Sequence, residues 1–205
     1  MSNTSNNAST TVNVWQQNLN KSDVAQQDLI NSIDPNMYMY DIIAIQEPYI
    51  DFLGNTQANQ RWYPLLPTAH RNDPKKTRVV TLINKRLLTS SWQQNKVDSQ
   101  DIVLVTISTS VGRITILNIY NDGAHSRSMD TIQQTLADDA SHARSIDPSK
   151  MIWLGNFNRH HPLWDEERNA HLFTANNLDA AQTLLDLLAD HNMIMALPKD
   201  IPVKN

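Results

Sequence analysis

The pattern of apolar and polar positions along the chain predicts a mixture of strands and helices. Segment 12–18 alternates apolar and polar residues, which is typical of a strand. A short apolar run at 42–45 is stopped by Gln46, Glu47 and a proline, which predicts a buried strand with polar residues at its C-terminal end. Further strands are predicted at 78–83, 101–108, 113–120 and 150–154, the second and third of these joined into a hairpin at Gly112.

Apolar residues that recur every three or four positions predict three helices. The first starts at Ser22 or Asp23, either of which can cap it, and ends before Pro35. The second is marked by the spacing of Met129, Ile132 and Leu136, and the third covers 178–188 and starts at Asn176 or Asn177. Strands and helices mix without strict alternation, and neither a repeat nor a linker divides them. We therefore expect one α/β or α+β domain with mixed sheets over residues 12–205.

The composition of the chain limits the kinds of functional site that this domain can contain. The chain has 205 residues, of which 40% are hydrophobic, so it is long enough to bury one sizeable core. It has no cysteine, which excludes disulfides, a thiolate nucleophile and a cysteine zinc site, so any metal must bind oxygen or imidazole. The net charge of −4 weakly opposes stable nucleic-acid binding but leaves room for a local basic strip.

The N-terminal segment 1–11 is uncharged and rich in Asn, Ser and Thr. It has neither the basic start nor the apolar run of a secretion signal, and we expect it to be a flexible tail. No apolar run approaches the roughly 20 residues that span a bilayer. We expect a protein with no membrane association that acts inside the cell, in the nucleus or the cytoplasm.

Polar residues follow the predicted strands at Asn18, Glu47 and the pair Asn156 and Asn158. In layered α/β proteins such strand ends gather in one crevice, where ligands bind. A carboxylate held at a strand end, such as Glu47, suits a hard cation such as Mg²⁺. The alternative is an ordinary exposed glutamate at the end of a strand, and the residue's position alone leaves both open.

Four segments in order carry a resemblance to a known family. They are Gln-Asn-Leu-Asn-Lys-Ser at 17–22, Ile-Gln-Glu-Pro at 45–48, Asn-Ile-Tyr-Asn at 118–121 and the tract Trp-Leu-Gly-Asn-Phe-Asn-Arg-His-His-Pro-Leu-Trp-Asp at 153–165. Together they resemble the endonuclease/exonuclease/phosphatase superfamily, in the branch of non-LTR retrotransposon endonucleases found in fungal genomes. The resemblance covers Asn18 to about Pro198. It implies a deoxyribonuclease I-like fold, a layered α/β sandwich of mixed sheets flanked by helices, and DNA as the substrate.

The resemblance also implies roles for individual residues. Relatives use an Asn like Asn18 and a Glu like Glu47 to hold Mg²⁺ or Mn²⁺ and the scissile phosphate. A Tyr like Tyr120 approaches that phosphate. In the family's Gly-Asp-x-Asn motif, the Asp orients or deprotonates the attacking water, and the final Asn, here Asn158, contacts the phosphate.

Two departures from the family pattern bear on activity. Asn156 stands where the motif has Asp, and a neutral amide cannot act as a base; losing a positioned base costs roughly 10²–10⁴-fold in rate. Relatives also continue past the position of Asn205 into closing strands that carry a Ser-Asp-His segment. From the resemblance we expect those C-terminal strands to be missing, the metal to bind weakly, and the open sheet edges to promote self-association. We expect Asn156→Asp alone not to restore a normal rate.

Basic residues are candidates for contacts with the DNA backbone. The densest basic stretch is 70–78, which is either a loop that grips phosphates or a solvated loop before a strand. Adjacent histidines at 160 and 161 point in different directions on any regular element, which disfavours a shared zinc ion. The predicted DNA-backbone contacts are Lys21, Arg71, Lys75, Lys76 and Arg159.

Three functions are consistent with these features. The first is a metal-dependent phosphodiesterase that nicks DNA and is impaired in this chain. The second is a catalytically decayed module that retains the fold and some binding of nucleic acid or another partner. The third is a phosphatase acting on a smaller substrate, which the motifs at 17–22 and 153–165 disfavour.

Overall fold

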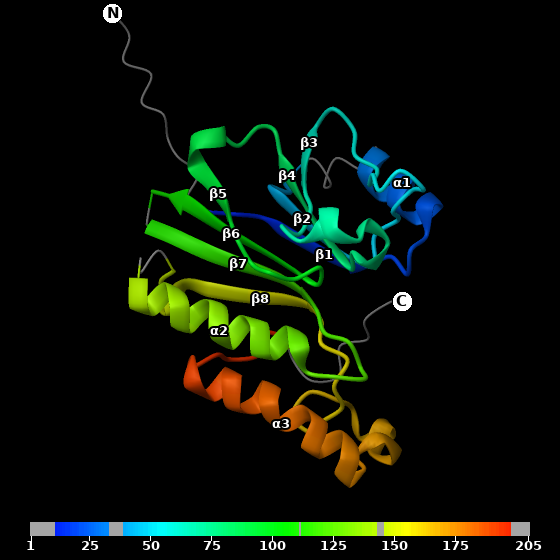
Figure 1. Ribbon diagram of the computed structural model, residues 1–205, viewed down its shortest axis with the longest axis vertical. Coiled ribbons are helices and arrows are strands. Elements are labelled where there is room, and N and C mark those ends of the chain that lie inside the picture. Colours follow the sequence, from blue (N-terminus) through cyan, green and yellow to red (C-terminus); the bar gives the residue numbers. More distant parts are fainter. Residues whose placement is uncertain (1–10, 33–38, 111, 143–145, 198–205) are drawn as a thin grey trace, which may run out of the picture.

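Two four-stranded sheets pack face to face, with helices on the outer face of each (Figure 1). The structure is a computed structural model that describes residues 11–32, 39–110, 112–142 and 146–197. Most of the predicted N-terminal tail therefore lies outside the described residues. None of the helices in these ranges is long and apolar enough to cross a membrane.

The first sheet has the strand order β1-β2-β4-β3. Strands β1 (Val14–Asn18) and β2 (Ile42–Gln46) run parallel, whereas β4 (Val79–Asn84) pairs antiparallel with both β2 and β3 (Trp62–Leu65). Because β1 and β2 are parallel, their C-terminal ends lie together. The first residue of β4 lies at this same edge, where Val79 pairs with Gln46.

The second sheet has the order β5-β6-β7-β8. Strands β5 (Trp92–Asn95), β6 (Ile102–Thr109) and β7 (Gly112–Tyr120) are successively antiparallel, and β8 (Met151–Asn156) is parallel to β7. The C-terminal ends of β7 and β8 therefore also lie together, and β8 packs against β1 of the first sheet.

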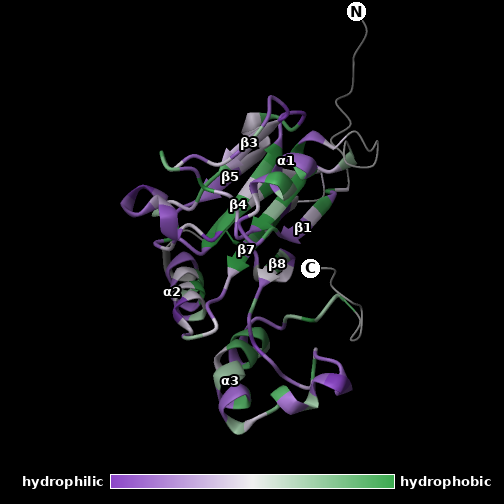
Figure 2. Ribbon diagram, turned by 90° about the vertical axis from the view of Figure 1, so that its right-hand side faces the viewer, coloured by the Kyte–Doolittle hydropathy of each residue, from purple (hydrophilic) through white to green (hydrophobic). Residues whose placement is uncertain are grey.

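Three apolar layers hold the sheets and helices together. Strand β6 shows how a continuous apolar run serves two of them: Val103, Val105 and Ile107 pack between the sheets, while Ile102 and Leu104 pack toward the helices. The third layer lies between the first sheet and its helix. Figure 2 shows hydrophobic residues concentrated in the central strands and hydrophilic loops around them. A strand buried on both faces needs apolar residues at every position, which explains the uninterrupted runs.

The helices are α1 (Asp23–Asn31), α2 (Arg127–His142) and α3 (Ala175–Asp190). Helix α1 covers the first sheet, and α2 and α3 cover the second (Figure 1). The hydroxyl of Ser22 caps α1 by accepting from the amide of Ala25 at 3.1 Å. Side-chain oxygens at helix starts satisfy amides that lack a partner within the helix.

These observations confirm the predicted fold class, a layered α/β sandwich of mixed sheets flanked by helices. The predicted hairpin joins β6 and β7. Strands β3 and β5 were not predicted. Helix α3 begins at Ala175, capped by Thr174, slightly earlier than expected.

Candidate active site

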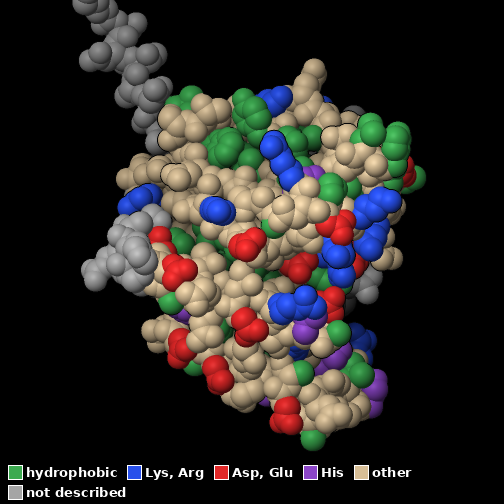
Figure 3. Space-filling view, in the orientation of Figure 1, with side chains coloured by type: hydrophobic (Ala, Val, Ile, Leu, Met, Phe, Trp, Pro, Cys, Tyr) green, Lys and Arg blue, Asp and Glu red, His purple; other side chains and the backbone are tan. Residues whose placement is uncertain are grey.

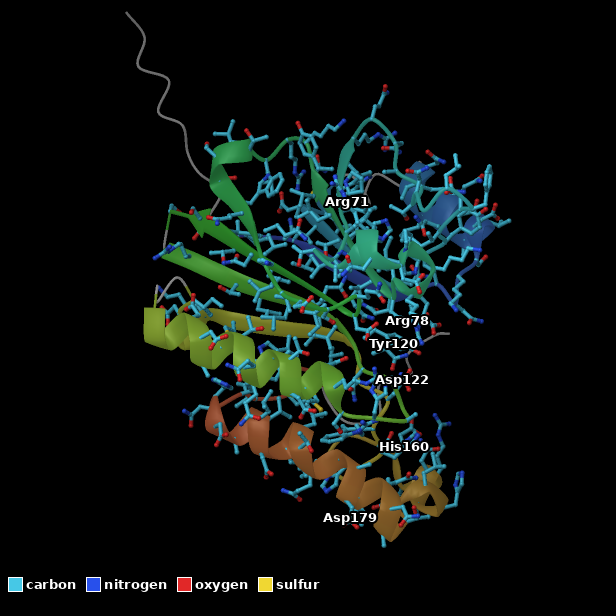
Figure 4. All side chains as sticks on the ribbon, viewed as in Figure 1. Arg71, Arg78, Tyr120, Asp122, His160 and Asp179 are labelled. Atoms are coloured by element: carbon cyan, nitrogen blue, oxygen red, sulfur yellow. The ribbon has the colours of Figure 1, made fainter. Side chains whose placement is uncertain are left out.

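Polar residues from both sheets meet where the C-terminal ends of β1, β2, β7 and β8 lie together. Asn18 ends β1 opposite Gln46, and Glu47 directly follows β2. In the second sheet Tyr120 ends β7 and pairs with Asn156, the last residue of β8. Arg78, Tyr120, Asp122 and His160 follow one another down the right-hand side of the molecule in Figure 4.

The side chain of Tyr120 lies at this edge near residues of both sheets. Its hydroxyl is close enough to the side chains of Glu47 and Asn158 for both to shift its pKa. Burial raises the pKa of Tyr120, and the neighbouring Glu47 carboxylate with its negative charge raises that pKa further. Tyr120 is therefore a neutral phenol at physiological pH, able to donate a proton in a hydrogen bond.

Glu47 and Asn158 both have left-handed backbone conformations, each with φ of 47°. Residues other than glycine rarely adopt this region, at a cost of about 1–3 kcal/mol where the conformation is strained, and such residues cluster at functional sites. Neighbouring bonds hold both in place. The amide of Glu47 donates to the carbonyl of Arg78 at 2.7 Å, and the side-chain amide of Asn158 donates to the carbonyl of Asn121, also at 2.7 Å.

The oxygens of Asn18 and Asn156 each accept one backbone amide. The Oδ1 of Asn18 accepts from Asn20 at 2.8 Å, and the Oδ1 of Asn156 accepts from Asn158 at 3.2 Å. A carbonyl oxygen has two lone pairs, so each keeps one for a cation or a water.

These side chains suit a weakly held hard cation. Glu47 supplies a carboxylate, and Asn18 and Asn156 supply neutral oxygens, which match the oxygen ligands that Mg²⁺ takes alongside several waters. Over the described ranges of the chain, no group of three or more His, Cys, Asp or Glu residues is placed to hold a metal ion. These residues therefore fit a metal ion that is held by one carboxylate, by neutral side-chain oxygens and by water.

A buried polar network supports the site from beneath, and the sequence analysis did not identify it. The side-chain amide of Gln46 donates to the Oδ1 of Asn118 at 2.6 Å. Asn118 in turn donates to the carbonyl of Val80 at 3.0 Å and to the hydroxyl of Thr81 at 3.2 Å. These bonds fix the register of the two sheets directly behind Glu47 and Tyr120. The available signals were a polar residue directly after the apolar run 42–45, Gln46, and one between apolar residues of β7, Asn118.

Arg78 also belongs to the site, although its role was not predicted. Its guanidinium lies over the ring of Tyr120, 4.8 Å from the centroid, and pairs with Asp122 at 3.4 Å. The cation lies on the electron-rich face of the ring, which is a favourable electrostatic contact. Arg78 therefore fixes the position of the tyrosine side chain.

The predicted DNA contacts divide into exposed and buried residues. Lys21, Arg71, Lys75 and Lys76 are exposed, and Lys76 also pairs with Asp73 at 3.2 Å. Lys75 and Lys76 belong to a short 3₁₀ helix (Pro74–Lys76), and Arg71 to the one before it (His70–Asn72). Figure 4 places Arg71 above Arg78 on this part of the molecule.

Arg159 is placed differently from that expectation. It is only 7% exposed, and its guanidinium donates to backbone carbonyls, among them Ala180 at 2.8 Å and His125 at 2.7 Å. Burial lowers its pKa. A guanidinium that donates to these carbonyls has a structural role, so Arg159 is not a DNA contact, contrary to the prediction.

The adjacent histidines serve the loop that follows β8. The amide of His161 donates to Asp165 Oδ2 at 2.9 Å, and His160 Nδ1 lies 3.3 Å from the same oxygen. The ring of His161 packs against Trp164, with 5.1 Å between centroids. These contacts account for both residues without a shared metal.

Comparisons with known proteins agree with this geometry. A family model described as Endonuclease-reverse transcriptase matches residues 114–204. The endonuclease domain of TRAS1, a telomere-specific non-LTR retrotransposon, superposes with a TM-score of 0.64 at 19% identity, over 94% of this chain and 76% of that one. The AP endonuclease LMAP from Leishmania major gives 0.60 at 9% identity, over 88% and 67%. A search of curated protein sequences found no match.

The matches confirm the predicted resemblance to the endonuclease/exonuclease/phosphatase superfamily. At these identities the solved structures establish the fold, which is the deoxyribonuclease I-like arrangement of mixed sheets and flanking helices.

Proposed function

We propose that the chain is a DNA endonuclease-type phosphodiesterase domain that requires Mg²⁺ or Mn²⁺ and is impaired by Asn156. The endonuclease-like fold and the family match at 114–204 support this class of reaction. The observation that carries the proposal is the convergence of Glu47, Tyr120 and Asn158 at one shared edge of the two sheets, where Glu47 and Asn158 both lie close enough to shift the pKa of the phenol.

Glu47 would hold the cation, helped by the side-chain oxygens of Asn18 and Asn156. When bound, such an ion supplies positive charge that activates water and stabilises the phosphate in the transition state. One carboxylate gives weak binding, so we expect the ion to exchange rapidly.

The remaining polar groups bind and orient the phosphodiester. Tyr120, kept neutral by its raised pKa, donates a hydrogen bond to a non-bridging oxygen of the bound phosphate. The side-chain amide of Asn158 offers a second donor at the same place. Lys21, Arg71, Lys75 and Lys76 are exposed cations that would neutralise neighbouring phosphates along the DNA.

Asn156 lowers the rate of hydrolysis in the proposed site. A neutral amide orients a water but does not take its proton, and the missing base is worth roughly 10²–10⁴-fold in rate. The same residue supports the second candidate function, a module that binds DNA with little or no hydrolysis. A DNA substrate would place either activity in the nucleus or the cytoplasm.

We also propose self-association through the sheet edges. In the described part of the chain, β1 and β8 each pair on one side only. Unpaired strand edges are templates for pairing with another copy.

Calorimetric titration of MgCl₂ and MnCl₂ tests the metal assignment. We expect weak, saturable binding by the chain and none by Glu47→Gln. Glu167→Gln is a matched control, because Glu167 is an exposed glutamate on a different segment (Glu167–Leu172). Equal binding by the chain and Glu47→Gln would remove Glu47 from the site.

A further inference from the structure

Two aromatic residues lie at the end of the molecule opposite the candidate active site. Tyr63 in β3 lies across β4 from the first residue of β2, and Trp92 in β5 lies across β6 from the start of β7. Glu47 follows the last residue of β2, and Tyr120 is the last residue of β7. The length of these strands therefore separates the two aromatic rings from the candidate active site.

Tyr63 and Trp92 form one platform across the edges of the two sheets. Their ring centroids are 6.0 Å apart, with an angle of 46° between the planes. Both residues are partly buried and pack on the apolar layer between the sheets. The side-chain amide of Gln94 in β5 donates to the carbonyl of Leu66, which follows β3, at 2.6 Å. Because the two edge strands are joined, the rings are held in position before any ligand binds.

Basic side chains surround this platform. The ammonium of Lys85 lies over the ring of Tyr63, 5.0 Å from its centroid, and Lys85 is exposed and makes no ion pair within the described ranges. Its amide donates to the carbonyl of Arg61 at 2.8 Å, which places a second basic residue beside it. The neighbouring acid, Asp41, is only 6% exposed and pairs with Arg86 at 2.9 Å. Figure 3 shows Lys or Arg side chains next to hydrophobic ones in the upper part of the molecule.

The chemistry of this surface selects one class of ligand. Pro64 in β3 has no N–H, so a partner strand added at this edge would lack a hydrogen bond there. Ring faces beside cations instead fit a ligand with planar groups and negative charge. Single-stranded nucleic acid has both, because its unpaired bases stack on aromatic rings while its phosphates meet basic side chains. A duplex keeps its base faces inside its own stack, and a carboxylate-rich peptide supplies charge without bases.

We propose that Tyr63, Trp92 and Lys85 form a binding site for single-stranded nucleic acid that is separate from the candidate active site. A base stacks on the exposed part of the Trp92 ring, and an adjoining phosphate lies against Lys85, which Tyr63 positions. Every base has a ring face, so the site binds strands of different sequence, in DNA or RNA. The inference does not depend on catalysis at the other end of the molecule.

Titration with oligo-dT and oligo-rU tests the site, followed by quenching of tryptophan fluorescence at several salt concentrations. We expect saturable quenching by both. Trp92→Leu should bind about 5- to 150-fold more weakly, the usual value of one stacked base. Trp92→Phe should retain most of the affinity, because it keeps a ring and loses only an indole N–H that has no hydrogen-bond partner among the described residues.

Lys85→Gln changes an exposed side chain and therefore tests the site without disturbing the fold. It should lower the slope of log affinity against log salt by about 0.7, the value of one phosphate contact with a single strand. Lys96→Gln is the matched control, because Lys96 is an exposed lysine at the other end of β5 and should leave the slope unchanged. Glu47→Gln should bind both oligonucleotides as the parent does.

Three results would overturn the proposal. The first is a parent chain that binds neither oligonucleotide, and the second is unchanged binding by both Trp92→Leu and Lys85→Gln. The third is polyglutamate that competes as well as the oligonucleotides do, because charge alone would then explain the binding. Failure of the proposed endonuclease activity would leave these readouts unchanged, since none of them involves cleavage.

Discussion

Gly155 lies in β8 next to Asn156, with φ of 140°. A Cβ at this position would lie 1.9 Å from the carbonyl oxygen of Ile119 in β7, which is far inside van der Waals contact. We expect Gly155→Ala to lower the free energy of unfolding by at least about 2 kcal/mol, because both the dihedral angle and the strand spacing exclude a methyl group. Thermal unfolding of the variant and the parent chain measures this loss of stability.

Gly123→Ala is the matched control for that variant. Nothing lies within 4 Å of a Cβ built at Gly123, so its unfolding temperature should change little. Equal stability of both variants would show that β7 and β8 tolerate a wider spacing at the site than the structure has.

The half-buried carboxyl of Asp101 makes the stability of the fold depend on pH. Burial raises the pKa of its carboxyl above 3.8, with Asp122 adding to the shift and Arg78, His125 and Arg127 opposing it. The folded protein therefore holds this proton to higher pH than the unfolded chain, and the associated stability is lost as pH rises through the folded pKa. At neutral pH the buried charge is a cost. Asp101→Asn should melt higher than the parent there, and the difference should shrink as pH falls below the folded pKa, followed by thermal unfolding across pH.

Arg159 connects several elements. Its guanidinium donates to carbonyls of the β7–α2 connection, including Gly123 at 3.3 Å, and to Ala180 in α3 at 2.8 Å. Arg159→Met would leave these carbonyls without a donor, each worth about 1–3 kcal/mol when buried. We expect a loss of about 2 kcal/mol or more in urea unfolding and faster amide exchange across 122–126.

Arg168→Met is the comparison, because Arg168 is exposed and its partner Glu166 lies two residues away. That variant should change stability by less than about 0.5 kcal/mol, as surface ion pairs contribute little. If the two variants unfold at the same urea concentration, Arg159 does not hold these elements together.

The predictability of each element from sequence follows from its burial. Strands β2 and β6 are buried on both faces and show as apolar runs, and Ser22 indicates the start of α1. Strands β3 and β5 are short edge strands, Trp-Tyr-Pro-Leu and Trp-Gln-Gln-Asn, that are only partly buried. An edge strand needs few apolar residues and tolerates proline, so neither gives an alternating pattern.

The site was predictable only in part, because it is assembled from residues distant in sequence. Strand-end positions and family motifs indicated Glu47, Tyr120 and Asn158 as candidates, but no local pattern shows that these side chains from two sheets lie close together. The prediction that Arg159 contacts DNA was wrong because its surroundings also come from residues distant in sequence. A basic residue after a motif resembles a phosphate contact, and only the fold shows that carbonyls surround it.

At the scale of the whole molecule, the open edges of β1 and β8 predict self-association. Ile152 on β8 is 44% exposed and would meet the partner strand. We expect sedimentation velocity to show concentration-dependent association of the chain, reduced by Ile152→Lys, because a charge at a strand edge opposes pairing. Leu88→Lys is the control, since Leu88 is exposed but lies outside the strands. A strictly monomeric chain at high concentration would contradict the prediction.

Magnesium-dependent nicking of supercoiled plasmid by the chain and by Asn156→Asp tests the central claim most directly. The account predicts nicking near background by the chain and an increase in Asn156→Asp of at most about 10²–10⁴-fold, the value of a positioned base, which still falls short of a normal rate. Adding Glu47→Gln to that variant should abolish the gain, and adding Glu167→Gln should not. Robust nicking by the unaltered chain, or nicking that persists in Glu47→Gln, would contradict it.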